Sequence, residues 1–145
     1  MYVMSRDQWW EFLSTGTRTG KLAVVRADGS PHVMPIWFVL DSADGHDYVV
    51  FNTAERTVKG RALARDPRFA LCVDDQQPPY SYVTIFGEAE LSGDLDAMLP
   101  WSTKLGARYM GEDVAEQFGK RNAAPGELLV RGRITKVIAQ GDISG

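Results

Sequence analysis

The stretch "VVFNTAERTVKGRALARDPRFALCVDD", residues 49–75, decides the fold of this chain. It begins with an apolar, β-rich run and continues as a short basic helix over residues 55–65. Pro67 ends that helix, because the residue before a proline is biased away from the helical conformation. A second β-rich run follows over residues 68–75. The stretch therefore predicts a strand, a helix and another strand in close succession.

This stretch also concentrates positive charge in a chain whose net charge is −3. Five of the sixteen basic residues lie in it: Arg56, Lys59, Arg61, Arg65 and Arg68. Arg56 and Lys59 fall in or near the first helical turn, where cations are unfavourable because the helix N-terminus already carries partial positive charge. One interpretation is a site for an anionic group, with free N–H groups and threonine hydroxyls as further donors. The other is a solvated helix face whose cations pair with Glu55 and Asp66.

Length and composition restrict the class of protein. With 145 residues and 44% hydrophobic residues, the chain is expected to form one domain over residues 1–145 with a core of its own. The negative net charge argues against broad nucleic-acid binding, which needs a basic face. No apolar run is long enough for a membrane span, and no secretory signal is visible. A single cysteine, Cys72, fits a reducing cytoplasmic environment, and no pattern of ligands predicts a metal site.

The remaining sequence predicts more strands and two more helices. Two β-rich runs within residues 21–41 flank Asp28-Gly29, a favoured tight-turn pair, and further strands are expected over residues 82–93 and 127–140. Ser5 and Gln8 have the spacing of a capping box at the start of a first helix. Residues 94–122 read as helix broken at Pro100, Gly106 and Gly111. The sum is a mainly β fold, with six short strands joined by turns, which is typical of an antiparallel barrel or sandwich.

The segment "HVMPIWFVL", residues 32–40, has a proline inside a strand. Pro35 cannot donate to a sheet ladder, so its strand is expected at an edge or at a bulge. Trp37 and Phe38 beside it offer a flat apolar surface, which suits a planar heteroaromatic ring. The alternative is a kink at a barrel corner with both aromatic residues in the core, and Cys72 is likewise interpreted as a small buried hydrophobe.

Two further segments carry aromatic residues that can line a pocket or pack in the core. Tyr80 and Tyr82 lie on a stiff loop, "QQPPYS", that enters a strand. Trp101, Arg108 and Tyr109 lie on the helical segment after Asp94, where one face can cover a ligand or a partner subunit.

The order of these features resembles the split β-barrel proteins of the pyridoxamine 5′-phosphate oxidase-like superfamily, which bind flavins and deazaflavins. The pieces that carry the resemblance are "GKLAVVRADGSPHVMPIWFVLD", "VVFNTAERTVKGRALARDPRFALCVDD" and "YVTIFGEAEL", and "LGARYMG" extends it. Within the superfamily the chain is most similar to the coenzyme F420-dependent reductases of actinobacteria. The resemblance implies a six-stranded antiparallel split β-barrel of the FMN-binding type that forms a homodimer.

The resemblance also implies the residues that bind the cofactor. The ring system lies along Met34, Pro35, Ile36 and Trp37, partly through the backbone. The strand end Phe51, Asn52 and Thr53 approaches the side chain of the cofactor, and Arg56, Lys59 and Arg61 hold its phosphate. Tyr80 or Tyr82 and the segment with Trp101, Arg108 and Tyr109 come from near the dimer interface.

The implied function is hydride transfer from reduced coenzyme F420 to an electron-poor small molecule, with no catalytic side chain assigned. An FMN-dependent enzyme similar to pyridoxamine phosphate oxidases is the first alternative, because FMN also needs a phosphate site. A protein that carries coenzyme F420 without turnover is the second, and a barrel with a purely structural or interaction role is the third.

Overall fold

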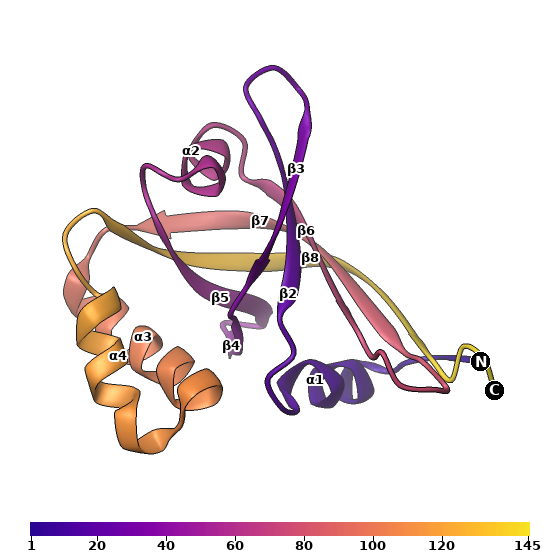
Figure 1. Ribbon diagram of the computed structural model, residues 1–145. Helices are drawn as coiled ribbons and strands as arrows, with labels where there is room; N and C mark the ends of the chain where they lie inside the picture. Colours follow the sequence, from indigo (N-terminus) through magenta and orange to yellow (C-terminus); the bar gives the residue numbers. More distant parts are fainter.

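The computed structural model describes residues 1–145 as a strongly curved antiparallel sheet with helices at its ends and over its concave side (Figure 1). The strands are β1 (Tyr2–Val3), β2 (Gly20–Val25), β3 (Pro31–Ile36), β4 (Val39–Ala43), β5 (His46–Ala54), β6 (Arg68–Asp74), β7 (Tyr82–Ser92) and β8 (Glu127–Gly141). The helices are α1 (Arg6–Ser14), α2 (Val58–Arg65), α3 (Leu95–Met110) and α4 (Ala115–Asn122), with a 3₁₀ turn at Glu112–Val114. None of the helices combines the length and hydropathy that a membrane crossing needs.

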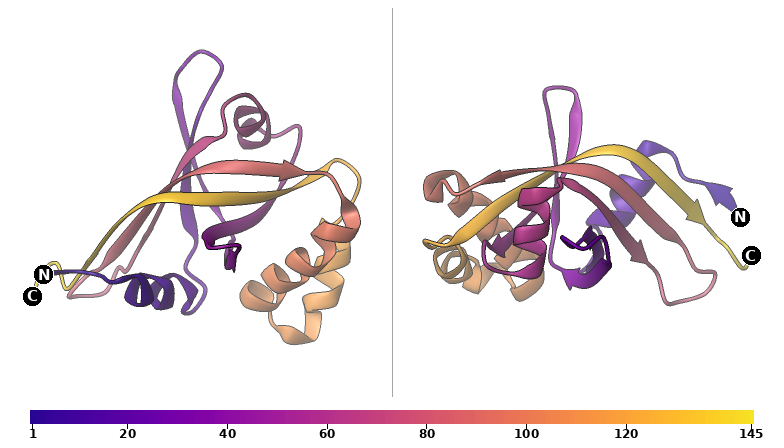
Figure 2. Two further views of the ribbon diagram at one scale, coloured as in Figure 1. Left: turned by 180° about the vertical axis from the view of Figure 1, so that it is seen from behind. Right: turned by 90° about the horizontal axis from the view of Figure 1, so that it is seen from above.

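The strand order shows how this curved sheet forms a split barrel. The strands follow the order β3-β2-β6-β7-β8-β5-β4, with β1 added to β8. The two edge strands, β3 and β4, are consecutive in the chain and only Trp37 and Phe38 separate them. The chain therefore crosses from one edge of the curved sheet to the other at this corner, while the long strands β7 and β8 run side by side through its middle (Figure 2).

The predicted fold class is confirmed, but the count of six strands is wrong. The structure has eight strands in one sheet. The run read as one strand before Asp41 divides at the Trp37–Phe38 corner, and the two-residue strand β1 is too short to show a period of two. Pro35 lies in an edge strand, as its missing N–H requires, and no bulge occurs there. The one register shift in the sheet lies between Phe86 and Gly87 of β7, opposite β8.

The core lies between the concave face of the sheet and helices α1 and α2. It contains eighteen buried residues, among them Leu13, Phe38, Phe51 and Leu71. Strand β6 buries alternate residues, so Cys72 points to the other face and is only half-buried. The interpretation of Cys72 as a buried hydrophobe was wrong, because period-two alternation outweighs the apolar character of its neighbours.

Helix α1 has the predicted capping box. The backbone N–H of Ser5 donates to Gln8 Oε1 at 2.8 Å, and the Gln8 N–H donates to Ser5 Oγ at 3.2 Å. Three side chains donate to carbonyls at the other end of this helix, which have no partner within it. They are Thr15 to Glu11 at 2.6 Å, Arg18 to Phe12 at 3.0 Å and Arg108 to Leu13 at 2.7 Å. Arg108 belongs to α3, so this contact fixes α3 against α1.

The break predicted between residues 94 and 122 occurs at one of its three positions. Helix α3 continues through Pro100 and Gly106 and ends at Gly111, whose φ of 111° is accessible mainly to glycine. Gly106 is the point where α4 approaches, since a Cβ there would lie 2.8 Å from the Cβ of Phe118. The glycine therefore allows close helix packing and does not end the helix.

Candidate functional site

The turn that leads into α2 is built by two threonines. Thr57 caps the helix by accepting from the Gly60 N–H at 3.1 Å, and its hydroxyl donates to the Ala54 carbonyl at 2.8 Å. The Thr53 hydroxyl lies 2.9 Å from that of Thr57. Helix α2 begins three residues later than predicted, because Thr57 is its cap, and Arg56 therefore lies in the turn before it. The hydroxyls hold the turn, while the N–H groups of Val58 and Lys59 have no acceptor in the chain.

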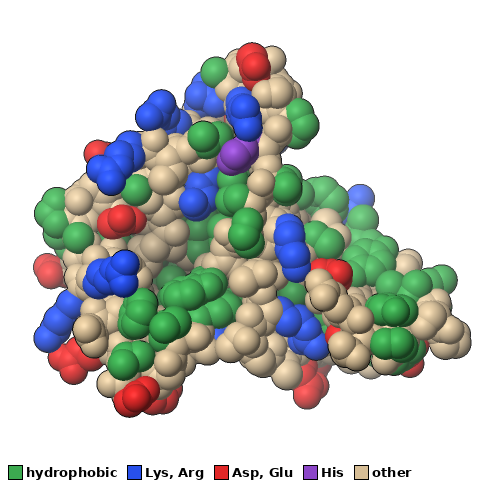
Figure 3. Space-filling view, in the orientation of Figure 1, with side chains coloured by type: hydrophobic (Ala, Val, Ile, Leu, Met, Phe, Trp, Pro, Cys, Tyr) green, Lys and Arg blue, Asp and Glu red, His purple; other side chains and the backbone are tan.

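The cations at the start of α2 are not neutralised. None of Arg56, Lys59 and Arg61 has a carboxylate within 4.0 Å. Asp66 instead pairs with Arg68 at 2.8 Å, and hydrogen bonds from Arg68 lower the pKa of Asp66 to about 2. The interpretation that these three cations pair with Glu55 and Asp66 is therefore wrong. Lys and Arg side chains gather along this edge, above a hollow that separates it from α3 and α4 (Figure 3).

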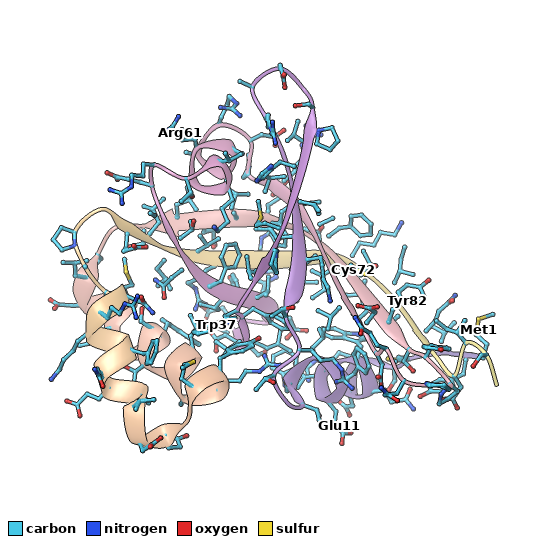
Figure 4. All side chains as sticks on the ribbon, viewed as in Figure 1. Met1, Glu11, Trp37, Arg61, Cys72 and Tyr82 are labelled. Atoms are coloured by element: carbon cyan, nitrogen blue, oxygen red, sulfur yellow. The ribbon has the colours of Figure 1, made fainter.

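A cavity of about 250 Å³ lies beside these cations and opens to solvent. It is lined by Pro35, Ile36, Trp37, Asn52, Lys59, Leu105, Asn122 and Glu127. The structure thus brings together five of the predicted binding residues, from β3, the β3–β4 corner, β5 and α2. Arg61 lies on the same helix as Lys59, and Figure 4 shows its position on α2 relative to Trp37 at the corner.

Strand β3 supplies the cavity wall with free backbone groups. It pairs with β2 along one edge only. The backbone groups of alternate residues point to the other edge, where no strand pairs with them. Phe38 is fully buried, whereas Trp37 is 37% exposed. The flat surface next to Pro35 is therefore provided by Trp37 alone, and Phe38 belongs to the core.

Trp37 is held in place by Tyr109. The two rings stack with centroids 5.0 Å apart and planes 3° apart. The Tyr109 hydroxyl donates to the Arg18 carbonyl at 2.9 Å and accepts from the Phe38 N–H at 3.2 Å. Burial raises the pKa of Tyr109 above its usual value, so the hydroxyl stays protonated. Tyr109 therefore supports the aromatic wall of the cavity, and its hydroxyl is already engaged within the chain.

Arg108 has its donors in the interior. It donates to the carbonyls of Leu13 at 2.7 Å, Phe38 at 2.6 Å and Gly16 at 3.0 Å. Burial lowers the pKa of its guanidinium, as expected for a charge without a carboxylate partner. Arg108 therefore connects α1, the β3–β4 corner and α3 in this structure.

The side chain of Asn52 also forms hydrogen bonds within the chain. Its Oδ1 accepts from the buried Ser102 hydroxyl at 2.7 Å, and its Nδ2 donates to the Leu128 carbonyl at 3.4 Å. These bonds join β5 to α3 and β8. The side chain of Asn52 lines the cavity, and its amide is already hydrogen-bonded within the chain.

The other predicted residues lie outside the cavity lining. Met34 packs against the core, Phe51 and Thr53 are buried, and Trp101 packs on a second small cluster with Tyr48 and Met98. Tyr80 and Tyr82 line a separate cavity of about 450 Å³. Figure 4 shows Tyr82 near Cys72 on the side toward the termini, away from Trp37. One chain therefore does not bring the two tyrosines to the cavity at α2.

Three lining residues had no predicted role in cofactor binding: Leu105, Asn122 and Glu127. Leu105 shares a helical face with Trp101 and Arg108, so helical spacing points to it. Asn122 ends α4 and Glu127 begins β8, and no motif surrounds either residue. The Ala123–Gly126 turn brings both residues to the cavity, because it leads from α4 into β8 beside β5. The sequence pattern does not predict where this turn lies in space.

The sequence that builds this site matches a known protein family. The pyridoxamine 5′-phosphate oxidase family matches residues 6–141. The chain belongs to this family. The match covers every element that forms the α2 cavity, from β3 to the start of β8. No curated protein matches the sequence significantly.

Solved structures share the fold of this chain. The conserved hypothetical protein Rv2991 from Mycobacterium tuberculosis is 23% identical and covers 98% of this chain and 88% of its own, with a TM-score of 0.81. A structure named F420 reductase is 27% identical, covers 88% and 94%, and has a TM-score of 0.68. An FAD-binding protein from Mesorhizobium loti is 19% identical, covers 95% of both chains, and has a TM-score of 0.65. The first and third likenesses concern the fold alone.

Proposed function

We propose that this chain is an oxidoreductase that uses reduced coenzyme F420 to transfer a hydride to an electron-poor small molecule. The observation that carries the proposal is the pairing of unneutralised cations at the start of α2 with a cavity whose wall is the free edge of β3 and Trp37. The 27% identity to an F420 reductase, over nearly the whole of both chains, supports the choice of cofactor.

The chain's residues fit an elongated ligand with a flat end and an anionic end. Lys59 in the cavity, with Arg56 and Arg61 next to it, provides charge-assisted donors for a phosphate. The free N–H groups of Val58 and Lys59 add neutral donors at the helix start. Trp37, fixed by Tyr109, and the backbone edge of β3 receive a planar ring. When bound, a deazaflavin supplies the hydride chemistry, and the protein supplies binding and orientation.

FMN is the second candidate cofactor, because it combines a planar ring with a phosphate and the matched family is named after pyridoxamine 5′-phosphate oxidase. Arg65 favours coenzyme F420, whose polyglutamate tail continues beyond the phosphate. It is exposed on α2, and its only polar contact is a 3.4 Å bond to the Val25 carbonyl. A longer polyanion would use this cation, whereas FMN would not reach past the phosphate site.

Turnover tests the proposal against a carrier role. We expect anaerobic mixtures of the protein, reduced coenzyme F420 and a panel of enones and quinones to reoxidise the cofactor with at least one acceptor, followed by its absorbance. Protein-free mixtures are the control. Tight binding of the cofactor with no reoxidation across the panel would support the carrier alternative and contradict the reductase.

We also propose that the protein is a homodimer that uses the outer face of β2, β3, β6, β7 and β8. This face exposes Val33 at 64% and Ile138 at 37%, and an apolar groove of about 330 Å³ includes Ala70 and Phe86. Exposed contiguous apolar surface of this kind marks an interface. The α2 cavity is also smaller than the ~300–1,000 Å³ typical of ligand pockets, so a second copy would help to enclose the ligand.

Sedimentation tests the dimer. We expect a dimer at micromolar concentration for the wild type and a monomer for Val33→Asp, because a carboxylate in an apolar interface is costly to desolvate. Glu11→Ala, at an exposed position of α1 outside this sheet face, is the control. A wild-type monomer at that concentration would contradict the proposal.

A further inference from the structure

The α2 cavity contains a carboxylate as well as a cation. Glu127 lines it together with Lys59, and it is the only carboxylate among the lining residues. Both side chains are half-buried, yet they form no ion pair, since no carboxylate oxygen lies within 4.0 Å of Lys59. The Glu127 carboxylate accepts no hydrogen bond within the chain. It therefore faces the cavity with its acceptor capacity unused.

The backbone fixes Glu127 at this position. It is the first residue of β8 and pairs with Ala54, the last residue of β5 before the turn into α2. Its N–H donates to the Ala124 carbonyl at 3.0 Å, and the Glu55 N–H donates to the Gly126 carbonyl at 2.9 Å. These bonds hold Glu127 beside the turn that carries Arg56. Its place in the cavity is therefore set by the sheet and does not depend on a mobile loop.

An ionised carboxylate only accepts hydrogen bonds, so it selects for ligand groups that donate. It repels a phosphate, which belongs with Lys59, and it offers nothing to the apolar part of a ring. Asn122, which lines the same cavity and has no side-chain partner in the chain, adds both a donor and an acceptor. Hydroxyl groups suit both side chains, because each hydroxyl donates one bond and accepts others.

We propose that Glu127 and Asn122 recognise the hydroxyls of a polyol chain between the flat end and the anionic end of the ligand. The inference rests on the proposed function, and it names the part of the cofactor that the cations and Trp37 leave without a partner. Glu127 accepts from the hydroxyls, Asn122 bridges them, and Lys59 holds the anion. The cavity thus offers three chemically different kinds of contact to one ligand.

Ligands without a phosphate isolate this contact from the effect of Glu127 on the anion site. We expect Glu127→Ala to weaken binding of a deazaflavin that has its ribityl chain but no phosphate by about 10- to 100-fold, the equivalent of one charge-assisted hydrogen bond. Binding of the same ring with a methyl group in place of the ribityl chain should change by less than about twofold. Glu127→Gln, which keeps an acceptor oxygen, should retain most of the affinity, and Asn122→Ala should show a smaller selective loss.

Fluorescence titration of the wild type and these variants with both ligands tests whether Glu127 and Asn122 bind the hydroxyls. Equal losses for the two ligands, or tighter binding of the ribityl ligand by Glu127→Ala, would overturn the inference, and Glu127→Gln and Asn122→Ala provide the same comparison if Glu127→Ala does not fold. A wild type that binds neither of these ligands nor complete coenzyme F420 would overturn the proposed function together with the inference. A wild type that binds them, with variants that show no selectivity, would overturn the inference alone.

Discussion

Replacing Arg108 with alanine is expected to lower the free energy of unfolding by roughly 3–5 kcal/mol, because three carbonyls lose a charged donor at once and each group left unsatisfied costs ~1–3 kcal/mol. The guanidinium bonds to three carbonyls, and the substitution leaves those of Leu13, Phe38 and Gly16 without this donor. The Leu13 carbonyl belongs to the last turn of α1, so the cation also opposes the negative end of that helix. Thermal unfolding should move down by about 10–20 °C for a domain of this size.

Two further variants separate these contacts from simple loss of charge. Arg108→Lys keeps the charge but cannot reach three carbonyls with a planar fork, so an intermediate loss is expected. Lys104→Ala removes an exposed cation four residues earlier on the same helix and should change stability by less than about 0.5 kcal/mol. If Arg108→Ala unfolds at the same temperature as Lys104→Ala, the structural role of Arg108 is wrong.

Replacing both Lys59 and Arg61 with alanine is expected to weaken binding of coenzyme F420 by about 100-fold or more, because in the proposed site each cation would supply a charge-assisted hydrogen bond to the phosphate. Neither side chain has an ion-pair partner to lose within the chain. Lys59 also lies in the first turn of α2, where a cation opposes the helix dipole. Stability of the free protein should therefore stay the same or rise slightly, as followed by thermal unfolding.

The matched control is Lys104→Ala with Lys120→Ala. This pair causes the same change in net charge on α3 and α4, and neither residue lines the cavity. It should bind coenzyme F420 within about twofold of the wild type, since the charges lie on other helices and exposed charges are screened. Equal losses of affinity in the two double variants would show that only net charge matters, and the local site would then be rejected.

Much of the fold was predictable because local signals carried it. The capping box at Ser5, the strands on either side of α2 and the edge position of Pro35 all follow from spacing and from missing donors. The corner at Trp37–Phe38 was not predictable, because a continuous apolar run does not show where a curved sheet changes edge. Helix α3 continues through Pro100 for a similar reason, since its packing against α4 outweighs local helix propensity.

The candidate site was predictable where it depends on charge. Lys59 was predicted as a binding residue because a cation is unfavourable at a helix start unless an anion binds there. In the structure Lys59 lies in the first turn of α2 and has no ion-pair partner within the chain. Spacing did not reveal that the side chains of Asn52, Arg108 and Tyr109 form hydrogen bonds within the chain, because their partners lie 50 or more residues away in sequence. Glu127 was missed because a single carboxylate at a strand start has no pattern around it.

The central claim is that the cations at the start of α2 bind the anionic end of a flat redox cofactor. Fluorescence titration of the wild-type protein with coenzyme F420, and with the same deazaflavin and ribityl chain lacking the phosphate, tests it most directly. We expect complete coenzyme F420 to bind at low micromolar concentration or below, and the phosphate-free ligand about 100-fold more weakly. Equal affinity for the two ligands, or no binding of coenzyme F420 at micromolar levels, would contradict the account.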